Sequence, residues 1–190
     1  ASYDITTINN NGLIASAGNP VTGTGFTANE IVDDAWTNTT GAPVNVVYTV
    51  VPVAVNGCSG QPFTVTITVD PKPTVTVQTA TACSDVAIGV ILGGSTNGVG
   101  IASYNITSIV SNGLVASAGN PATGNGFNAN EIADDAWTNN TAVAVDVVYT
   151  VVPVASGGCL GDPFTVTVTI NPEPIVANQA VTVCSDVPVG

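Results

Sequence analysis

Two groups of carboxylates are the residues in this chain whose types and spacing are best suited to chemistry. They occupy one short stretch and its repeat: Glu30, Asp33, Asp34, Glu131, Asp134 and Asp135. Calcium takes six to eight oxygen ligands, so these residues are candidate calcium ligands. The alternative is an acidic helix N-terminus in water, favoured because the stretch lacks the spaced acids and glycine of an EF-hand loop. Adjacent acids on a helix point in different directions, which argues against a glycosidase pair.

Four cysteines are the next candidates, and four cysteines allow three pairings. Cys83 and Cys159 fall inside one complete predicted domain, and we expect them to form a disulfide that closes it. Cys58 and Cys184 would then pair with cysteines outside this sequence. The geometry leaves another arrangement open, because Cys159 lies in a predicted hairpin turn and Cys83 precedes a strand that could start at the opposite end of the domain.

The composition excludes several classes of function. The chain has no His, so it has no Ser-His-Asp or Cys-His catalytic group and no His-ligated zinc. Lys72 is its only Lys or Arg and the formal net charge is −12, which disfavours nucleic acids and anionic membranes as partners. We expect no enzyme activity, no membrane insertion and no cofactor apart from calcium at the acidic groups. Four cysteines in a chain rich in Thr, Asn and Gly suit an extracellular, oxidising location.

An internal repeat dominates the sequence. Ala1-Ser2-Tyr3 recurs as Ala102-Ser103-Tyr104, 101 positions later, and the same offset relates the two halves without a gap. This period is the size of a whole β-sandwich domain and is too long for a solenoid repeat. Pro-flanked segments mark the boundaries and predict five parts. These are a partial domain lacking its first strands (1–70), a linker (71–73), a complete domain (74–171), a second linker (172–174) and the opening segment of a third domain (175–190). We expect the native protein to continue beyond both ends.

The pattern of residues predicts an all-β fold of tandem immunoglobulin-type β-sandwich domains. Apolar residues alternate with Thr over 63–69 and 164–170, as in strands with one buried face and one solvent-exposed face. Strands at 44–55 and 145–155 precede them and predict closing hairpins. Further strands are expected at 75–79, 86–92, 104–110 and 114–117. One short helix per copy is expected at 29–36 and 130–137, with Trp36 and Trp137 filling the core.

Four motifs resemble a known family of repeats. They are ACSD or VCSD at the opening, ANEI-x-DDAWTN in the middle, VVYTVVPV in a strand, and GC-x-G-x-PFTVT before a Pro-x-Pro linker. These motifs resemble the PKD-like, immunoglobulin-type repeats of giant cell-surface adhesins of Bacteroidota, a group that includes gliding-motility adhesins. The resemblance covers the whole chain. It implies a β-sandwich module, export by the type IX secretion system, and a role in surface adhesion or gliding, but it supplies no binding residue.

These features favour a structural stalk or spacer whose function lies in its length, rigidity and solubility. Its partners would be neighbouring repeats, with surface polysaccharide as a further candidate. Two other hypotheses stay open. In a self-assembling filament, the segment 175–190 of one chain would pair with the incomplete sheet of another by strand addition. A carbohydrate-binding repeat would need exposed aromatic side chains, whereas both Trp residues are expected in the core.

Overall fold

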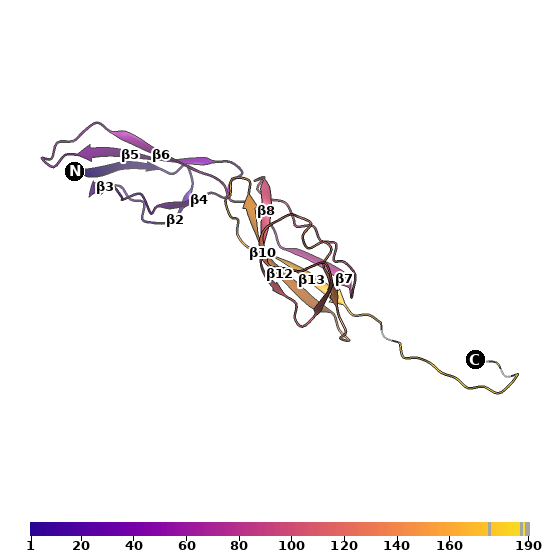
Figure 1. The fold of residues 1–190 in the computed structure, drawn as a ribbon. Coiled ribbons are helices and arrows are strands. Elements are labelled where there is room, and N and C mark those ends of the chain that lie inside the picture. The colour runs from indigo at the N-terminus through magenta and orange to yellow at the C-terminus, as the bar shows by residue number, and fades with distance from the viewer. Residues whose placement is uncertain (175, 187, 189–190) are drawn as a thin grey trace.

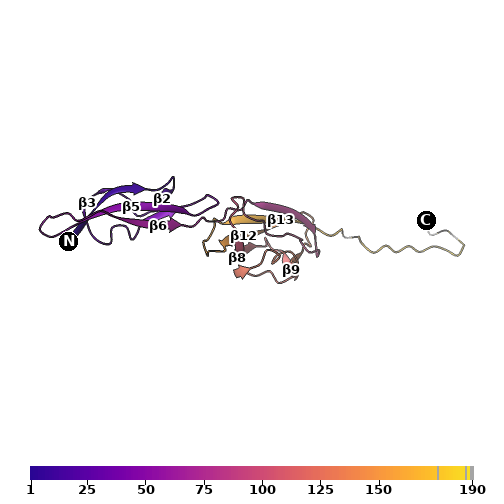
Figure 2. The ribbon, with the colours of Figure 1, turned by 90° about the horizontal axis from the view of Figure 1, so that it is seen from above.

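A computed structural model describes residues 1–174, 176–186 and 188 of the chain. The strands form two units arranged end to end, and an extended segment follows the second unit (Figures 1 and 2). Every regular element in the described residues is a β-strand. Within this part of the chain, no helix has the length and apolar character that crossing a membrane would require.

The second unit is built around a five-stranded sheet. Its elements are β7 (Gln78–Cys83), β8 (Ile101–Val110), β9 (Val115–Ala118), β10 (Gly124–Phe127), β11 (Ala136–Thr138), β12 (Val145–Ala155) and β13 (Phe164–Asn171). The large sheet has the order β10-β8-β12-β13-β7, and β9 pairs with β11 in a small second sheet. All these pairs are antiparallel except β7, which runs parallel to β13 at the outer edge. This arrangement is an immunoglobulin-like β-sandwich.

The first unit repeats this design with a four-stranded sheet. Its elements are β1 (Ser2–Asn9), β2 (Ile14–Ala17), β3 (Gly23–Phe26), β4 (Ala35–Thr37), β5 (Val44–Val53) and β6 (Phe63–Val69). The large sheet has the order β3-β1-β5-β6, and β2 pairs with β4. Strand β6, which corresponds to β13, is therefore an outer strand, and no described segment lies beside it as β7 lies beside β13.

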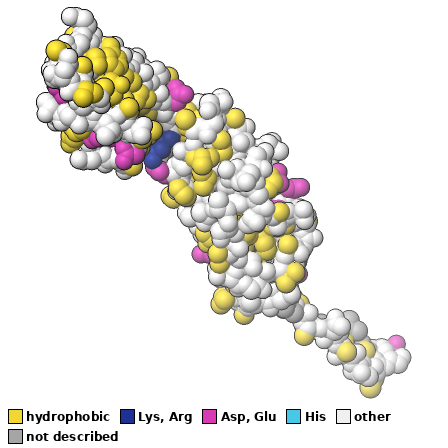
Figure 3. All heavy atoms as spheres, turned by 60° about the vertical axis from the view of Figure 1, so that its left-hand side comes forward, with side chains coloured by type: hydrophobic (Ala, Val, Ile, Leu, Met, Phe, Trp, Pro, Cys, Tyr) yellow, Lys and Arg dark blue, Asp and Glu magenta, His cyan; other side chains and the backbone are white. Residues whose placement is uncertain are grey.

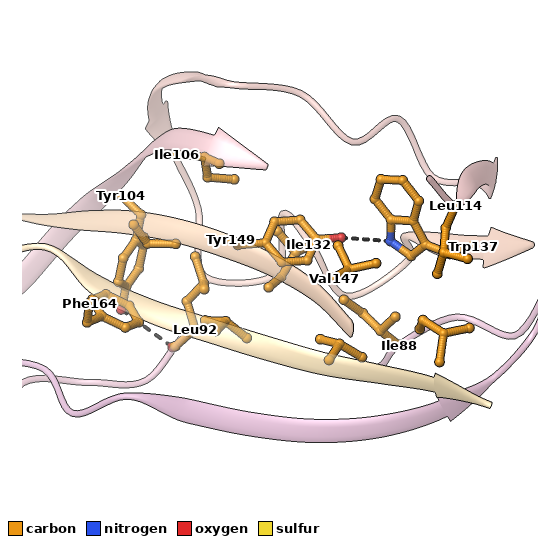
Figure 4. Close-up of a cluster of buried hydrophobic side chains, with 14 residues drawn as sticks. Ile88, Leu92, Tyr104, Ile106, Leu114, Ile132, Trp137, Val147, Tyr149 and Phe164 are labelled. Carbon is orange, nitrogen blue, oxygen red and sulfur yellow. Dashed lines mark hydrogen bonds between the residues drawn. The ribbon is translucent and has the colours of Figure 1, made fainter. Parts of the chain in front are cut away.

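The alternation of residues along the strands places the core on one face of each large sheet. Along β13, Val166, Val168 and Ile170 are completely buried, whereas the Thr residues between them are half-buried. β-Branched residues pack well on such a pleated surface. In the second unit, Tyr149 and Trp137 converge on this layer with Ile88 and Leu92, which come from the segment between β7 and β8 (Figure 4).

Several predicted strands are confirmed and two are corrected. The segments 63–69 and 145–155 form β6 and β12 with the predicted bounds. The strand expected at 75–79 lies instead at Gln78–Cys83. The segment 86–92 is not a strand, because its amides bond to turn residues of the same unit rather than to a sheet neighbour.

The predicted helices at 29–36 and 130–137 are wrong, because both segments form turns that lead into β4 and β11. The amides of Glu30 and Val32 bond to carbonyls three residues earlier, at 3.4 and 3.2 Å, which is the spacing of turns and not of an α-helix. The segment cannot continue as a helix because Trp36 pairs with β2. The expectation that the tryptophans fill the cores is confirmed, since Trp137 is buried and Trp36 packs against the first core.

Candidate functional site

A chain of hydrogen bonds links Trp137, Tyr149 and Asp135 in the core of the second unit. The indole Nε1–H of Trp137 donates to the Tyr149 hydroxyl at 3.0 Å (Figure 4), and this hydroxyl donates to Oδ2 of Asp135 at 2.9 Å. All three side chains are buried. These bonds connect β11 and the turn before it to β12. The three residues therefore form a polar clamp between the two sheets.

Burial determines how the groups of this clamp ionise. It raises the pKa of Asp135 to about 6; the hydrogen bond from Tyr149 opposes the rise, and the charges of Asp134 and Glu131 add to it. Burial also raises the pKa of Tyr149, as does the neighbouring Asp135. Removing a carboxylate from water disfavours its charged form, so the clamp is easiest to bury when Asp135 is protonated.

The first unit contains the same clamp, but its residues are less buried there. Trp36 Nε1–H donates to the Tyr48 hydroxyl at 3.1 Å, and the hydroxyl donates to Oδ2 of Asp34 at 2.7 Å. Burial raises the pKa of Tyr48 to about 12, and the hydrogen bond to Asp34 adds to this rise. Asp34 is only half-buried, and its Oδ1 atom has no hydrogen-bond partner among the described residues.

The six candidate calcium ligands do not converge on one point in either unit. Asp34 and Asp135 accept hydrogen bonds from the tyrosine hydroxyls. Glu131 and Asp134 line an open depression on the surface. Within the described residues, no group of three or more acidic, Cys or His side chains is placed to hold a metal ion. A calcium role for these six residues stays a prediction.

The structure places Cys83 and Cys159 at opposite ends of the second unit. Cys83 ends β7 opposite Asn171, the last residue of β13. Cys159 lies in the hairpin turn before β13, where its carbonyl accepts a hydrogen bond from the Ala155 amide. The eight residues of β13 span about 26 Å. The expected Cys83–Cys159 disulfide is therefore not formed, and all four cysteines are free thiols. The pairing of Cys58 and Cys184 outside this sequence stays a prediction.

Two buried asparagines organise the turns after β4 and β11, and sequence reasoning missed this role. Asn139 Nδ2 donates to the carbonyls of Ile170 and Val143 at 2.7 and 2.9 Å, and its Oδ1 accepts bonds from the amide and hydroxyl of Thr141. Asn38 makes the same four bonds in the first unit. The recurrence of Asn-x-Thr at the same place in both copies was the available signal.

A third amide, Asn97, fastens the second unit to the first. Its Nδ2 atom lies 3.2 Å from the carbonyl oxygens of Thr39 and Thr40, and 3.0 Å from that of Lys72 in the linker. The Lys72 ammonium also pairs with Asp162 of the second unit at 2.6 Å, and Figure 3 shows this cation between the two units. An exposed ion pair contributes little stability, so the amide is the stronger fastening. Sequence reasoning gave no signal for Asn97.

A glycine permits the close contact at this joint. A Cβ atom on Gly41 would lie 2.5 Å from the carbonyl oxygen of Asn97, closer than real contacts allow. The corresponding position at the far end of the second unit is Ala142, and Glu173 corresponds to Lys72. A joint of the same geometry would therefore be disfavoured at the far end of the second unit.

The first unit leaves part of its core uncovered beside β6. Phe63 is 44% exposed, whereas its counterpart Phe164 is 3% exposed. A cavity of ≈ 240 Å³ opens here, lined among others by Tyr3, Phe26, Ile31 and Val65. Figure 3 shows hydrophobic side chains gathered on this unit. We call this surface, defined by those four residues and Phe63, the open face.

In the second unit, β7 and the segment after it cover the equivalent surface. Ala80 and Ala82 of β7 pack against the core, and Ile88 and Leu92 are buried in it. The amides of Ile88, Gly89 and Leu92 also donate to three carbonyls of the turn before β11, at 2.8–2.9 Å. This segment therefore supplies both apolar cover and hydrogen-bond donors.

The corresponding carbonyls of the first unit belong to Asp34, Val32 and Ala28. None of the three accepts a backbone hydrogen bond from any described residue. The open face consequently lacks both things that the second unit receives from residues 78–92: a layer of apolar side chains and a row of backbone donors.

In a comparison with known protein families, both units match the same type of domain. A family model described as PKD-like domain matches residues 2–73 and 80–174, which together make up most of the chain. The two matched ranges correspond to the two structural units. No curated protein matches the chain.

Proposed function

Because the chain belongs to the PKD-like domain family, we propose that it is a structural stalk of an extracellular surface protein and not an enzyme. More specifically, we propose a spacer in a long bacterial adhesin or surface filament that serves adhesion or gliding and leaves the cell by type IX secretion. The motifs that resemble Bacteroidota adhesin repeats support this finer assignment. The proposal includes no cofactor and no nucleic-acid partner.

The joint between the two units is the observation that carries this proposal. A spacer holds a distal site away from the cell only if its units keep a fixed orientation. Asn97 binds carbonyls of the first unit and of the linker at once, which couples three parts of the chain. The Lys72–Asp162 pair lies at the same joint, and Pro71 and Pro73 restrict the linker backbone. These contacts favour a stiff connection over a flexible one.

The use of the aromatic residues supports a spacer over a carbohydrate-binding repeat. Sugar-binding surfaces need aromatic rings that face solvent. Both tryptophans here donate hydrogen bonds to tyrosine hydroxyls within the cores. The exposed Phe63 belongs to the open face beside β6, where its counterpart Phe164 packs against other protein residues.

A distance measurement across the joint tests the stalk proposal. Spin labels on Cys58 and Cys159 report one position in each unit, in a chain whose Cys83 and Cys184 are replaced by Ser. Double electron–electron resonance should give one narrow distance distribution. The same labels in an Asn97→Ala, Lys72→Gln chain should give a broad distribution, because both side-chain fastenings are lost.

A matched control is Asn125→Ala, which alters an exposed amide on β10 away from the joint. It should leave the distribution narrow. A broad distribution in the unaltered chain would contradict a rigid spacer. Antibody labelling of intact cells tests the location separately, and a signal seen only after the cells are opened would contradict an extracellular stalk.

A further inference from the structure

We propose that the open face of the first unit binds residues 176–186 of a second copy of this chain as a strand parallel to β6. We propose further that a disulfide between Cys184 of this added strand and Cys159 of the receiving copy locks the junction. The inference rests on the proposed function for the arrangement of units in series, and it names the contact that joins one copy to the next.

The receiving surface is incomplete in a specific way. Among the residues that the structure describes, none pairs with the outer edge of β6, whereas in the second unit the equivalent edge of β13 receives a parallel strand over six residue pairs. The cavity beside Phe63 and Val65 lies on the same open face. An exposed strand edge with an apolar face is a template for strand addition.

Part of the donated segment repeats the sequence of β7, the strand that covers the equivalent edge in the second unit. Residues 179–184, QAVTVC, stand 101 positions after β7, whose sequence is QTATAC. In β7 the inward residues are Ala80 and Ala82, and Val181 and Val183 hold these positions in the segment. Val181 is 68% exposed and Val183 is 39% exposed in this structure. Figures 1 and 2 both show the segment extending away from the second unit.

The second unit also fixes the register of the added strand. Val168 pairs with Ala80, Ile170 with Ala82, and Asn171 with Cys83. Carried over to the first unit, this register sets Val181 opposite Ile67, Val183 opposite Val69 and Cys184 opposite Asp70. Val181 and Val183 then lie on the core side of the sheet, beside Ile67 and Val69, and Cys184 reaches the end of β6 that adjoins the joint between the units.

Cys159 of the receiving copy lies at that same joint. The Asp70 carboxylate is 3.8 Å from the position that a Cβ atom on Gly157 would occupy. Gly157 and Cys159 belong to one hairpin turn, two residues apart. A strand that sets Cys184 opposite Asp70 therefore brings its thiol beside Cys159.

The disulfide forms by exchange with a small disulfide oxidant, for which glutathione disulfide is the test reagent. The Cys184 thiolate attacks the oxidant and releases one glutathione thiolate. The Cys159 thiolate then attacks the mixed disulfide and releases the second. Two protein thiols are oxidised to one disulfide, and one glutathione disulfide is reduced to two thiols, which take up the two protons.

The test uses the full chain with Cys58 and Cys83 replaced by Ser, so that only the proposed pair can react. Sedimentation under reducing conditions from micromolar to millimolar chain should give an average mass several-fold above the 18.8 kDa of one chain. Glutathione disulfide should then convert these species into a ladder on a non-reducing gel. Cleavage after Glu should release the fragment 132–173 joined to the fragment 174–190.

Two tail variants separate strand addition from other association. Val181→Asp with Val183→Asp places charges on the inward side and should leave a monomer without a ladder. Ala180→Asp with Thr182→Asp places the same charges on the outward side and should retain both. A synthetic peptide of residues 175–190 should bind the inward variant with one-to-one stoichiometry and shift its Trp36 fluorescence to shorter wavelength.

Three results would overturn the inference. These are a monomer at every concentration with no binding of the peptide, a ladder that survives the inward variant, or a disulfide map that joins other positions. The outcome is separable from that of the proposed function. A narrow spin-label distribution with no association would retain the stalk and reject the strand addition, and association with a broad distribution would do the reverse.

Discussion

The two units share about two thirds of their paired residues, but the same side chains are buried to different extents. Ile132 is 1% exposed and Trp137 is 5% exposed, whereas Ile31 and Trp36 are only half-buried. The contrast is largest next to β6 and β13. It follows the presence of β7 and the segment to Leu92 in the second unit and not any change in the core residues themselves.

The side-chain hydrogen bonds of the Trp–Tyr pair and of the buried asparagine do not follow this difference. The distance from the Trp Nε1 atom to the Tyr hydroxyl oxygen is 3.1 Å in the first unit and 3.0 Å in the second. The buried Asn38 and Asn139 each make the same four bonds. The Trp–Tyr bond and the bonds of the buried asparagine are therefore formed within each unit, while the enclosure of the apolar core depends on a segment that is distant in sequence.

Truncating the matched phenylalanines should give the largest difference in stability change between the two units. Phe164→Ala removes an enclosed ring and should destabilise the second unit by about 3–5 kcal/mol. Phe63→Ala should cost the first unit about 1–2 kcal/mol, because the ring already contacts water and its loss leaves no closed cavity. Hydrogen–deuterium exchange in increasing urea, read separately for peptides of β6 and β13, measures both. Equal losses in the two units would contradict the open face.

The second prediction concerns pH and the buried Asp135. Burial raises the pKa of Asp135 to about 6, so between pH 4 and 6 the folded state holds more protons than the unfolded state. The free energy of unfolding of the second unit should therefore fall as pH rises through this window, by up to about 3 kcal/mol. Asp135→Asn keeps an oxygen for the Tyr149 hydroxyl and should flatten this slope.

Another acid near Asp135 provides the control for this prediction. Asp134→Asn changes an exposed acid next in sequence and should largely preserve the slope. Urea unfolding of each variant between pH 4 and pH 7 measures the slopes. If the Asp135→Asn chain had the same slope as the unaltered chain, the pH dependence of stability could not be assigned to the Asp135 carboxyl.

The third prediction identifies where the two units should agree. Asn38→Ala and Asn139→Ala each remove a buried amide that donates to two carbonyls, and each should destabilise its own unit by about 1–3 kcal/mol. Exchange rates of the peptides that contain β5 and β12 give the two values. Thr40→Val and Thr141→Val remove fewer bonds and should cost less. If the two Asn variants differed by as much as the two Phe variants, the polar networks would depend on the covering segment after all.

The repeat and the strand periodicity made much of this fold predictable. The strands at 63–69 and 145–155, one in each unit, follow directly from apolar residues on one face. The predicted helix at 29–36 is wrong because Asn and Glu at the start of a segment also suit a turn, and only the pairing of its last residues with β2 decides between the two. Tertiary contacts outweigh local propensity here.

The candidate site was less predictable, because it depends on distances across the chain. The acids were visible in sequence, but nothing local shows that Asp135 turns inward to Tyr149. The placement of Cys83 at the far end of β13 requires the parallel pairing of β7. Asn97 is one polar loop residue among many, and its role arises only where the two units meet.

The smallest effect on stability is expected at the joint. Gly41→Ala should change the free energy of unfolding of either unit by less than about 0.5 kcal/mol, because the residue is exposed. It should nevertheless displace the joint, since the new Cβ atom would lie 2.5 Å from the Asn97 carbonyl and neither backbone can give way as a side-chain end could. The spin-label distance between Cys58 and Cys159 should shift or broaden.

Ala142→Gly is the reverse change at the matching position of the second unit, and it should leave that distance unchanged. A shift with Gly41→Ala but not with Ala142→Gly would mean that one methyl group at the end of a unit sets the angle to the next. Joints along a stalk could then be made stiff or loose by this position alone. An unchanged distance with Gly41→Ala would instead assign the orientation to the Pro-flanked linker, and the two ends of a unit would be equivalent in spite of their different residues.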